Sequence, residues 1–217
     1  NPVYFNADEW IRLARDCGMQ YFVFTSKHHD GFALFHSKVD KYNVVDATPF
    51  GRDIIKELSV ACRNRGLKFG IYYSQELDWH EEHGGGYSET FETNQGKPWT
   101  NFWDFPNTVK NFEICFRKKI IPQVTELLTN YGKIDILWYD VSCPLTSGES
   151  WDSVNRNYRL RKLQPDIIIN TRSAIPEDFG TPLPIPSISK KDSVYGSGMW
   201  RGPVWINYNY MICRGLR

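Results

Sequence analysis

The sequence predicts an α/β fold, an incomplete (β/α)8 barrel of the TIM type, from three observations on its 217 residues. Apolar runs suited to buried strands alternate with helical patterns, which is typical of parallel strands joined by helical crossovers. The longest polar connections follow strands, as in barrels with extended loops at the carboxyl ends of the strands. Only four such strands are visible, whereas a complete barrel needs about 250 residues and eight strands. We therefore expect about half a barrel.

The composition indicates one sizeable core and gives no electrostatic reason to bind nucleic acid or a membrane, because the net charge is +1 with 24% charged residues. No apolar run is long enough to span a bilayer. No glycine-rich phosphate loop follows a strand, which argues against a nucleotide-binding fold. Assembly as a homo-oligomer stays open. The five cysteines are widely scattered: Cys17, Cys62, Cys115, Cys143 and Cys213. Their spacing indicates neither a zinc site nor a disulfide framework.

The first helix begins after Asn6, which suits an N-cap and is followed by acids in the first turn. We expect its apolar positions, among them Leu13 and Cys17, to be buried. Gly18 ends the helix, and residues 21–25 form the first strand.

A long connection over residues 27–50 follows that strand, and such a loop is more often functional than idle. It begins with Lys27-His28-His29-Asp30-Gly31-Phe32. The next helix starts near Asp53, buries Cys62 and ends at Gly66. We expect Lys118 and Lys119, further along the chain, to lie on a solvated helix face. The remaining elements are a strand at 67–73, a polar loop at 74–106, a helical segment at 107–131 interrupted or bent at Pro122, a strand at 134–140, a helix at 151–163 and a strand at 167–170.

The strand at 134–140 ends on Asp140, beside an aromatic residue and just before a turn. Barrel enzymes present catalytic acids in this way. Asp140 could equally cap the next helix or satisfy a loop, and this stretch alone leaves both interpretations open.

Four strand ends bring polar groups to one face of the predicted barrel. A carboxylate among imidazoles, a phenol, an indole and a guanidinium suits a polyhydroxylated substrate, because the carboxylate can attack an anomeric carbon while the indole packs on the apolar face of the sugar. These groups are His28 and His29, Tyr72 with Ser74, Trp138, Asp140 and Arg172. A metal site at His28 and His29 is the alternative, but neighbouring residues on a strand diverge, so we expect no metal.

Three segments carry a resemblance to a known family. KHHDGF with GLKFGIYYS, together with ILWYDV, resembles the catalytic domain of α-L-fucosidases of glycoside hydrolase family 29 over about residues 3–182. The resemblance implies a (β/α)8 barrel and a retaining hydrolase without metal or cofactor, acting on terminal α-L-fucosyl linkages of oligosaccharides or glycoconjugates. It implies that Asp140 is the nucleophile. It also implies that the substrate-binding residues are His28, His29, Tyr72, Trp138 and Arg172.

The chain departs from the family pattern at two places. The first family strand is expected to lie before Asn1. The segment DFGTP at 178–182 is followed by Leu183, where many members carry the glutamate that acts as general acid/base. Leu183 can neither donate nor accept a proton, so the general acid is not identified, and Glu177 is the nearest substitute.

Residues 183–217 resemble a different group, the (α/α)6 glycosidases of the family 63 type, through MWRGPVWINYNYMICRGL. We therefore expect residues 1–182 to form a partial catalytic barrel and residues 183–217 a tail that adds no barrel strand. Two other functions stay open: a fucose-binding domain without catalysis, and a fragment of a family-63-type glucosidase or mannosylglycerate hydrolase. The family resemblance suggests a secreted, periplasmic or lysosomal protein.

Overall fold

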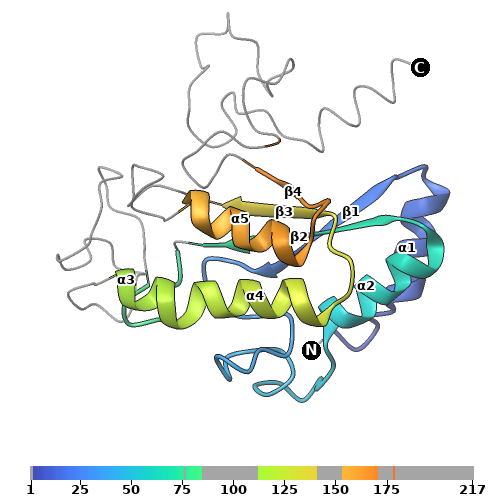
Figure 1. Ribbon diagram of the computed structural model, residues 1–217. Coiled ribbons are helices and arrows are strands. Elements are labelled where there is room, and N and C mark those ends of the chain that lie inside the picture. The colour runs from blue at the N-terminus through green and yellow to red at the C-terminus, as the bar shows by residue number, and fades with distance from the viewer. Residues whose placement is uncertain (1, 76, 85–111, 141–152, 171–177, 179–217) are drawn as a thin grey trace, which may run out of the picture.

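The computed structural model describes residues 2–75, 77–84, 112–140, 153–170 and 178. Over these residues the chain is an α/β fold built on a parallel four-stranded sheet of order β1-β2-β3-β4, with helices between successive strands (Figure 1). This confirms the predicted alternation, and element ends move by a few residues. Among the described helices, none is long and apolar enough to cross a bilayer. The elements are α1 (Ala7–Asp16), β1 (Tyr21–Lys27), α2 (Ile54–Arg65), β2 (Lys68–Ser74), α3 (Phe112–Cys115), the π-helical turn η1 (Phe116–Ile120), α4 (Ile121–Asn130), β3 (Ile136–Asp140), α5 (Ser153–Leu163) and β4 (Ile168–Ile169).

The first two long helices begin and end as their capping residues predict. The Asn6 side chain accepts a hydrogen bond from the Glu9 amide at 3.1 Å, and Asp53 caps α2 in the same way. Gly66 ends α2 in the left-handed conformation, with φ of 68°, which glycine adopts without steric cost.

The buried face of α1 is not the one the sequence suggested. Ala7, Ile11 and Ala14 are buried, whereas Leu13 is 58% exposed and Cys17 is also exposed. The expectation for Leu13 and Cys17 was wrong, because α1 packs on α2 and the side chains that it buries come from a different face of the helix. The prediction for Cys62 is confirmed, since this thiol is fully buried.

The helical segment before β3 is interrupted as predicted, and the structure shows how. The π-helical turn η1 joins α3 to α4, and Pro122 is the second residue of α4. Proline has no amide hydrogen to donate to the carbonyl four residues back, and a π-helical turn relieves the resulting mismatch in the hydrogen-bond ladder.

The two faces of the sheet have different roles, which follow from the alternation of side chains along each strand. One face packs against the helices and forms the core, where Ile71, Tyr73 and Tyr139 are fully buried. The other face carries Tyr72 and Trp138, which are neighbours in the strand register and only partly buried. The polar groups predicted at the strand ends therefore belong to the face away from the helices.

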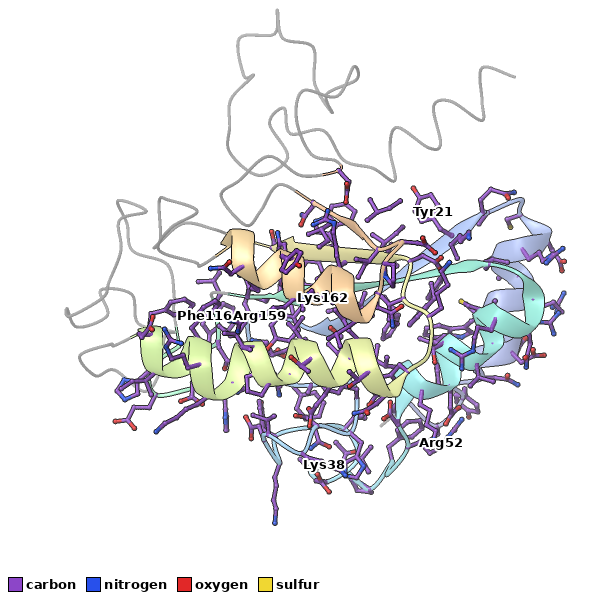
Figure 2. All side chains as sticks on the ribbon, viewed as in Figure 1. Tyr21, Lys38, Arg52, Phe116, Arg159 and Lys162 are labelled. Carbon is purple, nitrogen blue, oxygen red and sulfur yellow. The ribbon has the colours of Figure 1, made fainter. Side chains whose placement is uncertain are left out.

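The long connection between β1 and α2 packs below α4 (Figures 1 and 2). Ala33 and Phe35 are fully buried in it. The Ser37 hydroxyl donates to Glu126 of α4 at 2.9 Å, and the Tyr131 hydroxyl donates to Asp53 at 2.8 Å. Much of this loop is thus structural, and its first residues are the ones that reach the strand ends.

Candidate active site

A β-bulge at the end of β1 determines where the histidine pair lies. Thr25 pairs with Tyr72, but Lys27 pairs with Tyr73, so Ser26 is the extra residue. The bulge moves Lys27 to the helix side of the sheet, where its ammonium lies 4.8 Å from the centre of the Tyr73 ring. Bulges commonly re-aim side chains in this way beside active sites. The next residue, His28, consequently lies on the opposite side, against Tyr72.

Asp140 lies at the carboxyl end of β3, directly opposite Ser74 in the strand register. The Tyr72 hydroxyl donates a hydrogen bond of 2.6 Å to Asp140 Oδ2. The carboxyl side chain is 20% exposed, so solvent or a ligand can reach it. Asp140 therefore belongs to a polar cluster at the strand ends, and it is too far along the chain from α5, which begins at Ser153, to cap that helix.

His29 is held from several directions. Its Nδ1 lies 2.7 Å from Ser74 Oγ, and its Nε2 lies 3.8 Å from Asp140 Oδ2. Burial lowers the pKa of His29 to about 4, helped by the charges of His28 and Lys27 and opposed by Asp140. His29 is thus neutral at physiological pH.

His28 and His29 lie side by side, with ring centres 4.0 Å apart. The expectation that neighbouring histidines diverge was wrong, because the chain has left the regular strand at this point. The exposed His28 also stacks on Tyr72, with ring centres 5.4 Å apart. No group of three or more metal-ligating side chains gathers within the described ranges.

A buried ion network lies beneath the histidines. Lys27 and Lys119 both pair with Asp78 Oδ2, at 2.9 and 3.0 Å, and Lys119 also pairs with Asp40 at 2.7 Å. The solvated position expected for Lys119 was wrong, since this residue is only 2% exposed. The π-helical turn holds Lys119 on the buried side, whereas the neighbouring Lys118 is exposed as predicted.

Charge balance explains why this network is stable in the interior. Burial opposes ionisation of Asp78, but Lys27 and Lys119 outweigh it and lower the pKa of the carboxyl group. Burial likewise opposes the charge of Lys119, and Asp78 and Asp40 raise its pKa. Gly31, with φ of 80°, lies so close that an added Cβ would stand 2.1 Å from Asp78 Oδ1. The network therefore ties the histidine loop to the loop after β2.

Sequence reasoning missed two residues near the histidines, Trp79 and Asp78. The Trp79 amide donates to the His29 carbonyl at 2.8 Å, and its indole lies 6.1 Å from the imidazole, centre to centre. Their position in a polar loop directly after β2 was the available signal. The predicted Arg172, Glu177 and Leu183 lie outside the described residues, as does the predicted tail.

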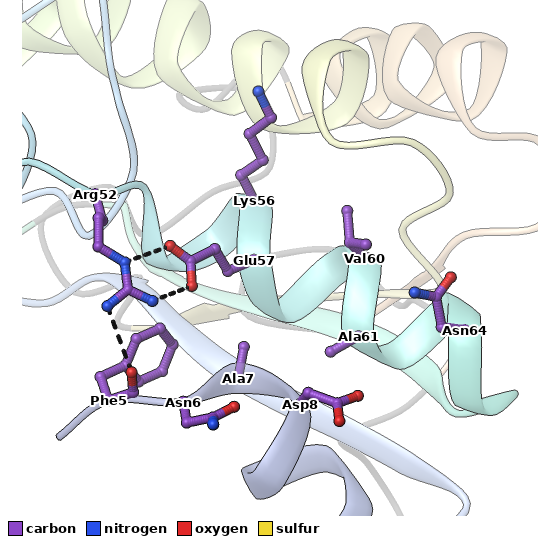
Figure 3. Close-up of a pocket in the computed structure, with 10 residues that line it drawn as sticks. All are labelled: Phe5, Asn6, Ala7, Asp8, Arg52, Lys56, Glu57, Val60, Ala61 and Asn64. Carbon is purple, nitrogen blue, oxygen red and sulfur yellow. Dashed lines mark hydrogen bonds and ion pairs between the residues drawn. The ribbon is translucent and has the colours of Figure 1, made fainter.

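A separate cavity of about 530 Å³ lies between α1 and α2 (Figure 3). Two of its charged lining residues pair with each other, because Arg52 forms a two-pronged ion pair with Glu57 and also donates to the Phe5 carbonyl. None of the predicted site residues lines this cavity. We therefore assign the chemistry to the strand ends and not to this groove in the helical layer.

Known proteins resemble this chain in sequence and in structure. An α-L-fucosidase from Lactobacillus casei, solved in complex with its α-L-fucose product, is 54% identical to this chain. That match covers 80% of this chain and 54% of the other, with a TM-score of 0.69. An α-L-fucosidase from Vibrio sp. strain EJY3 is 39% identical over 81% of this chain and 29% of its own, with a TM-score of 0.66.

Relatives known by sequence are similar to a smaller share of the chain. Human plasma α-L-fucosidase is 37% identical over 139 residues, which are 63% of this chain and 25% of that protein. The rat plasma enzyme is 38% identical over 145 residues, covering 63% and 26%. The chain thus spans about a quarter of the length of these relatives. A family model described as α-L-fucosidase matches residues 1–181. The chain belongs to the α-L-fucosidase family.

Proposed function

We propose that this chain supplies the catalytic nucleophile of a retaining exo-glycosidase that hydrolyses terminal α-L-fucosyl linkages. The observation that carries the proposal is the carboxylate of Asp140, which is oriented by the Tyr72 hydroxyl at 2.6 Å and lies beside the His29 imidazole. An oriented carboxylate at a strand end, with neutral hydrogen-bonding groups around it, suits attack on a sugar.

The proposed reaction has two steps. In the first, Asp140 attacks the anomeric carbon, the glycosidic bond breaks, and a general acid protonates the departing oxygen. In the second, the same acid/base group takes a proton from water, which attacks the anomeric carbon and releases fucose and the free carboxylate of Asp140. His28, His29 and Arg172 bind the sugar hydroxyls, and Trp138 packs on the apolar face of the sugar.

Fucosides of amino sugars are the proposed substrates. A mutant of the Lactobacillus casei enzyme was solved in complex with Fucα(1,6)GlcNAc, and its sequence is 53% identical to this chain. Release of fucose from this disaccharide by the full chain, measured by a coupled fucose assay, tests the proposal. Turnover that Asp140→Gly abolishes supports it, and turnover that persists in the variant contradicts it.

Leu183 favours a second function, fucose binding without catalysis. Loss of general acid/base assistance costs about 10²- to 10⁴-fold in rate, whereas the proposed hydroxyl contacts come from other strands. Calorimetry with fucose beside the disaccharide assay separates the two functions. Binding without turnover supports the second. Normal turnover excludes it and makes Glu177 the first residue to replace in a search for the acid.

We further propose that residues 1–182 form half of a (β/α)8 barrel and that residues 183–217 add no strand to it. The parallel order β1-β2-β3-β4, with all crossover helices on one face, supports this architecture. Two prolines within Leu183–Pro186 argue against a buried strand there. Intact-mass measurement with peptide mapping across residues 170–200 tests whether the two parts share one polypeptide.

A further inference from the structure

We propose that Ser74 is a positioning residue: it holds His29 in the tautomer protonated on Nδ1, so that the Nε2 lone pair accepts a hydrogen bond from a substrate hydroxyl. The tautomer follows from contacts within the chain. The role toward the sugar rests on the proposed fucosidase function.

The Ser74 hydroxyl has one proton and two buried partners. Its oxygen lies 2.9 Å from the Leu77 carbonyl oxygen and 2.7 Å from His29 Nδ1. A carbonyl oxygen can only accept, so the hydroxyl donates to Leu77, and its oxygen is left to accept from Nδ1–H. In the reverse arrangement, two buried oxygens would face each other at 2.9 Å without a proton between them, and the Leu77 carbonyl would lose this donor.

The electrostatics of the site agree with a neutral ring. Burial, His28 and Lys27 together hold the pKa of His29 at about 4 against the opposing effect of Asp140. A neutral imidazole carries one N–H, so protonation at Nδ1 leaves Nε2 as an acceptor. Nε2 lies 3.8 Å from Asp140 Oδ2, too far for a direct hydrogen bond. A sugar hydroxyl beside both atoms can donate to Nε2 while Asp140 keeps its charge for attack.

The segment after β2 fixes the ring as well as its tautomer. Ser74 lies opposite Asp140 in the sheet and binds one edge of the imidazole, while the Trp79 amide holds the His29 carbonyl at 2.8 Å. The orientation of His29 relative to Asp140 is thus set by one strand end and its loop. With the other tautomer, Nε2–H would point toward the carboxylate and compete with the sugar for it.

The test uses the full chain with ¹⁵N-labelled histidine, whose nitrogen shifts report the tautomer directly by NMR. His29 is assigned among the five histidines from the signals lost in His29→Gln. We expect a pyrrole-type shift at Nδ1 and a pyridine-type shift at Nε2 of His29 in the wild-type protein at pH 7. The opposite pattern overturns the proposal without any variant or activity measurement.

Variants then test the hydroxyl itself. Ser74→Ala should weaken the Nδ1–H preference and lower kcat/KM on Fucα(1,6)GlcNAc about 10- to 100-fold, while Ser74→Thr keeps a hydroxyl and restores both. Ser59→Ala is the matched control, because Ser59 is also fully buried and donates to a backbone carbonyl, that of Lys56. An unchanged tautomer in Ser74→Ala overturns the proposal. Lack of turnover in the wild-type chain counts against the fucosidase function and leaves the tautomer measurement to decide the role of Ser74.

Discussion

Tyr72 donates a hydrogen bond of 2.6 Å to Oδ2 of Asp140, across two neighbouring parallel strands. The residues are not directly opposite each other in the register, since Tyr72 pairs with Trp138 and Ser74 pairs with Asp140. The phenol therefore reaches a residue that lies two positions beyond its own partner along β3. A long aromatic side chain on the face of β2 away from the helices can span this distance, and its hydroxyl fixes the orientation of the carboxyl group.

Tyr72→Phe removes this hydrogen bond and keeps the ring that stacks on His28. Hydrogen bonds to charged groups contribute about 1.5–3 kcal/mol, so we expect kcat/KM on an α-L-fucoside to fall about 10- to 100-fold. The melting temperature should change little, because Tyr72 is only partly buried. Tyr42→Phe, a partly buried tyrosine in the loop before α2, is the matched control. Wild-type kinetics in Tyr72→Phe would remove the phenol from this role.

The lowered pKa of His29 predicts how stability depends on pH. An unfolded histidine takes up its proton near 6.5, whereas folded His29 does so near 4. The unfolded state binds more protons between these values, so the stability present above pH 6.5 falls as the pH drops toward 4. At pH 4.5, His29 alone therefore lowers the free energy of unfolding by about 2–3 kcal/mol relative to neutral pH.

Urea unfolding of the wild type and His29→Gln at pH 7 and pH 4.5 measures this effect. The loss of unfolding free energy between the two pH values should be smaller in the variant by about 2–3 kcal/mol. His36→Gln, which replaces an exposed histidine, is the matched control. Equal losses in the wild type and His29→Gln would show that His29 does not titrate as described.

The buried ion network predicts that replacing Lys119 destabilises the fold far more than replacing the neighbouring Lys118. Lys119→Met leaves the fully buried Asp78 with Lys27 as its remaining ion-pair partner in the described part of the chain, and breaking a buried pair costs about 3–5 kcal/mol. Lys118→Met on the exposed side should change the free energy of unfolding by less than about 0.5 kcal/mol. Chemical denaturation of both variants measures the difference. Equal stabilities would mean that the network contributes nothing.

Much of this arrangement could be predicted from the sequence. Capping residues at Asn6 and Asp53 gave the starts of two helices, and apolar runs gave the strands and the carboxylate at the end of β3. The proximity of Tyr72, His28, His29 and Asp140 followed because parallel strands present their carboxyl ends at one edge.

Other features depend on packing that no local pattern reveals. The bulge at Ser26 changes which side Lys27 takes, and it depends on pairing with a strand more than forty residues away. The buried position of Lys119 depends on the π-helical turn and on partners from two distant loops. On α1, the buried face is that of Ala7, Ile11 and Ala14, and which face of this helix is buried depends on its packing against α2.

Covalent trapping of the intermediate decides whether Asp140 attacks the anomeric carbon. Incubation of the full chain with a 2-deoxy-2-fluoro-fucosyl fluoride slows breakdown of the fucosyl-enzyme, and peptide mass mapping then locates the label. We expect one added 2-fluorofucosyl group on the side chain of Asp140, with no labelling in Asp140→Gly. A label on another residue, or turnover of a fucoside without any covalent species, would contradict this expectation.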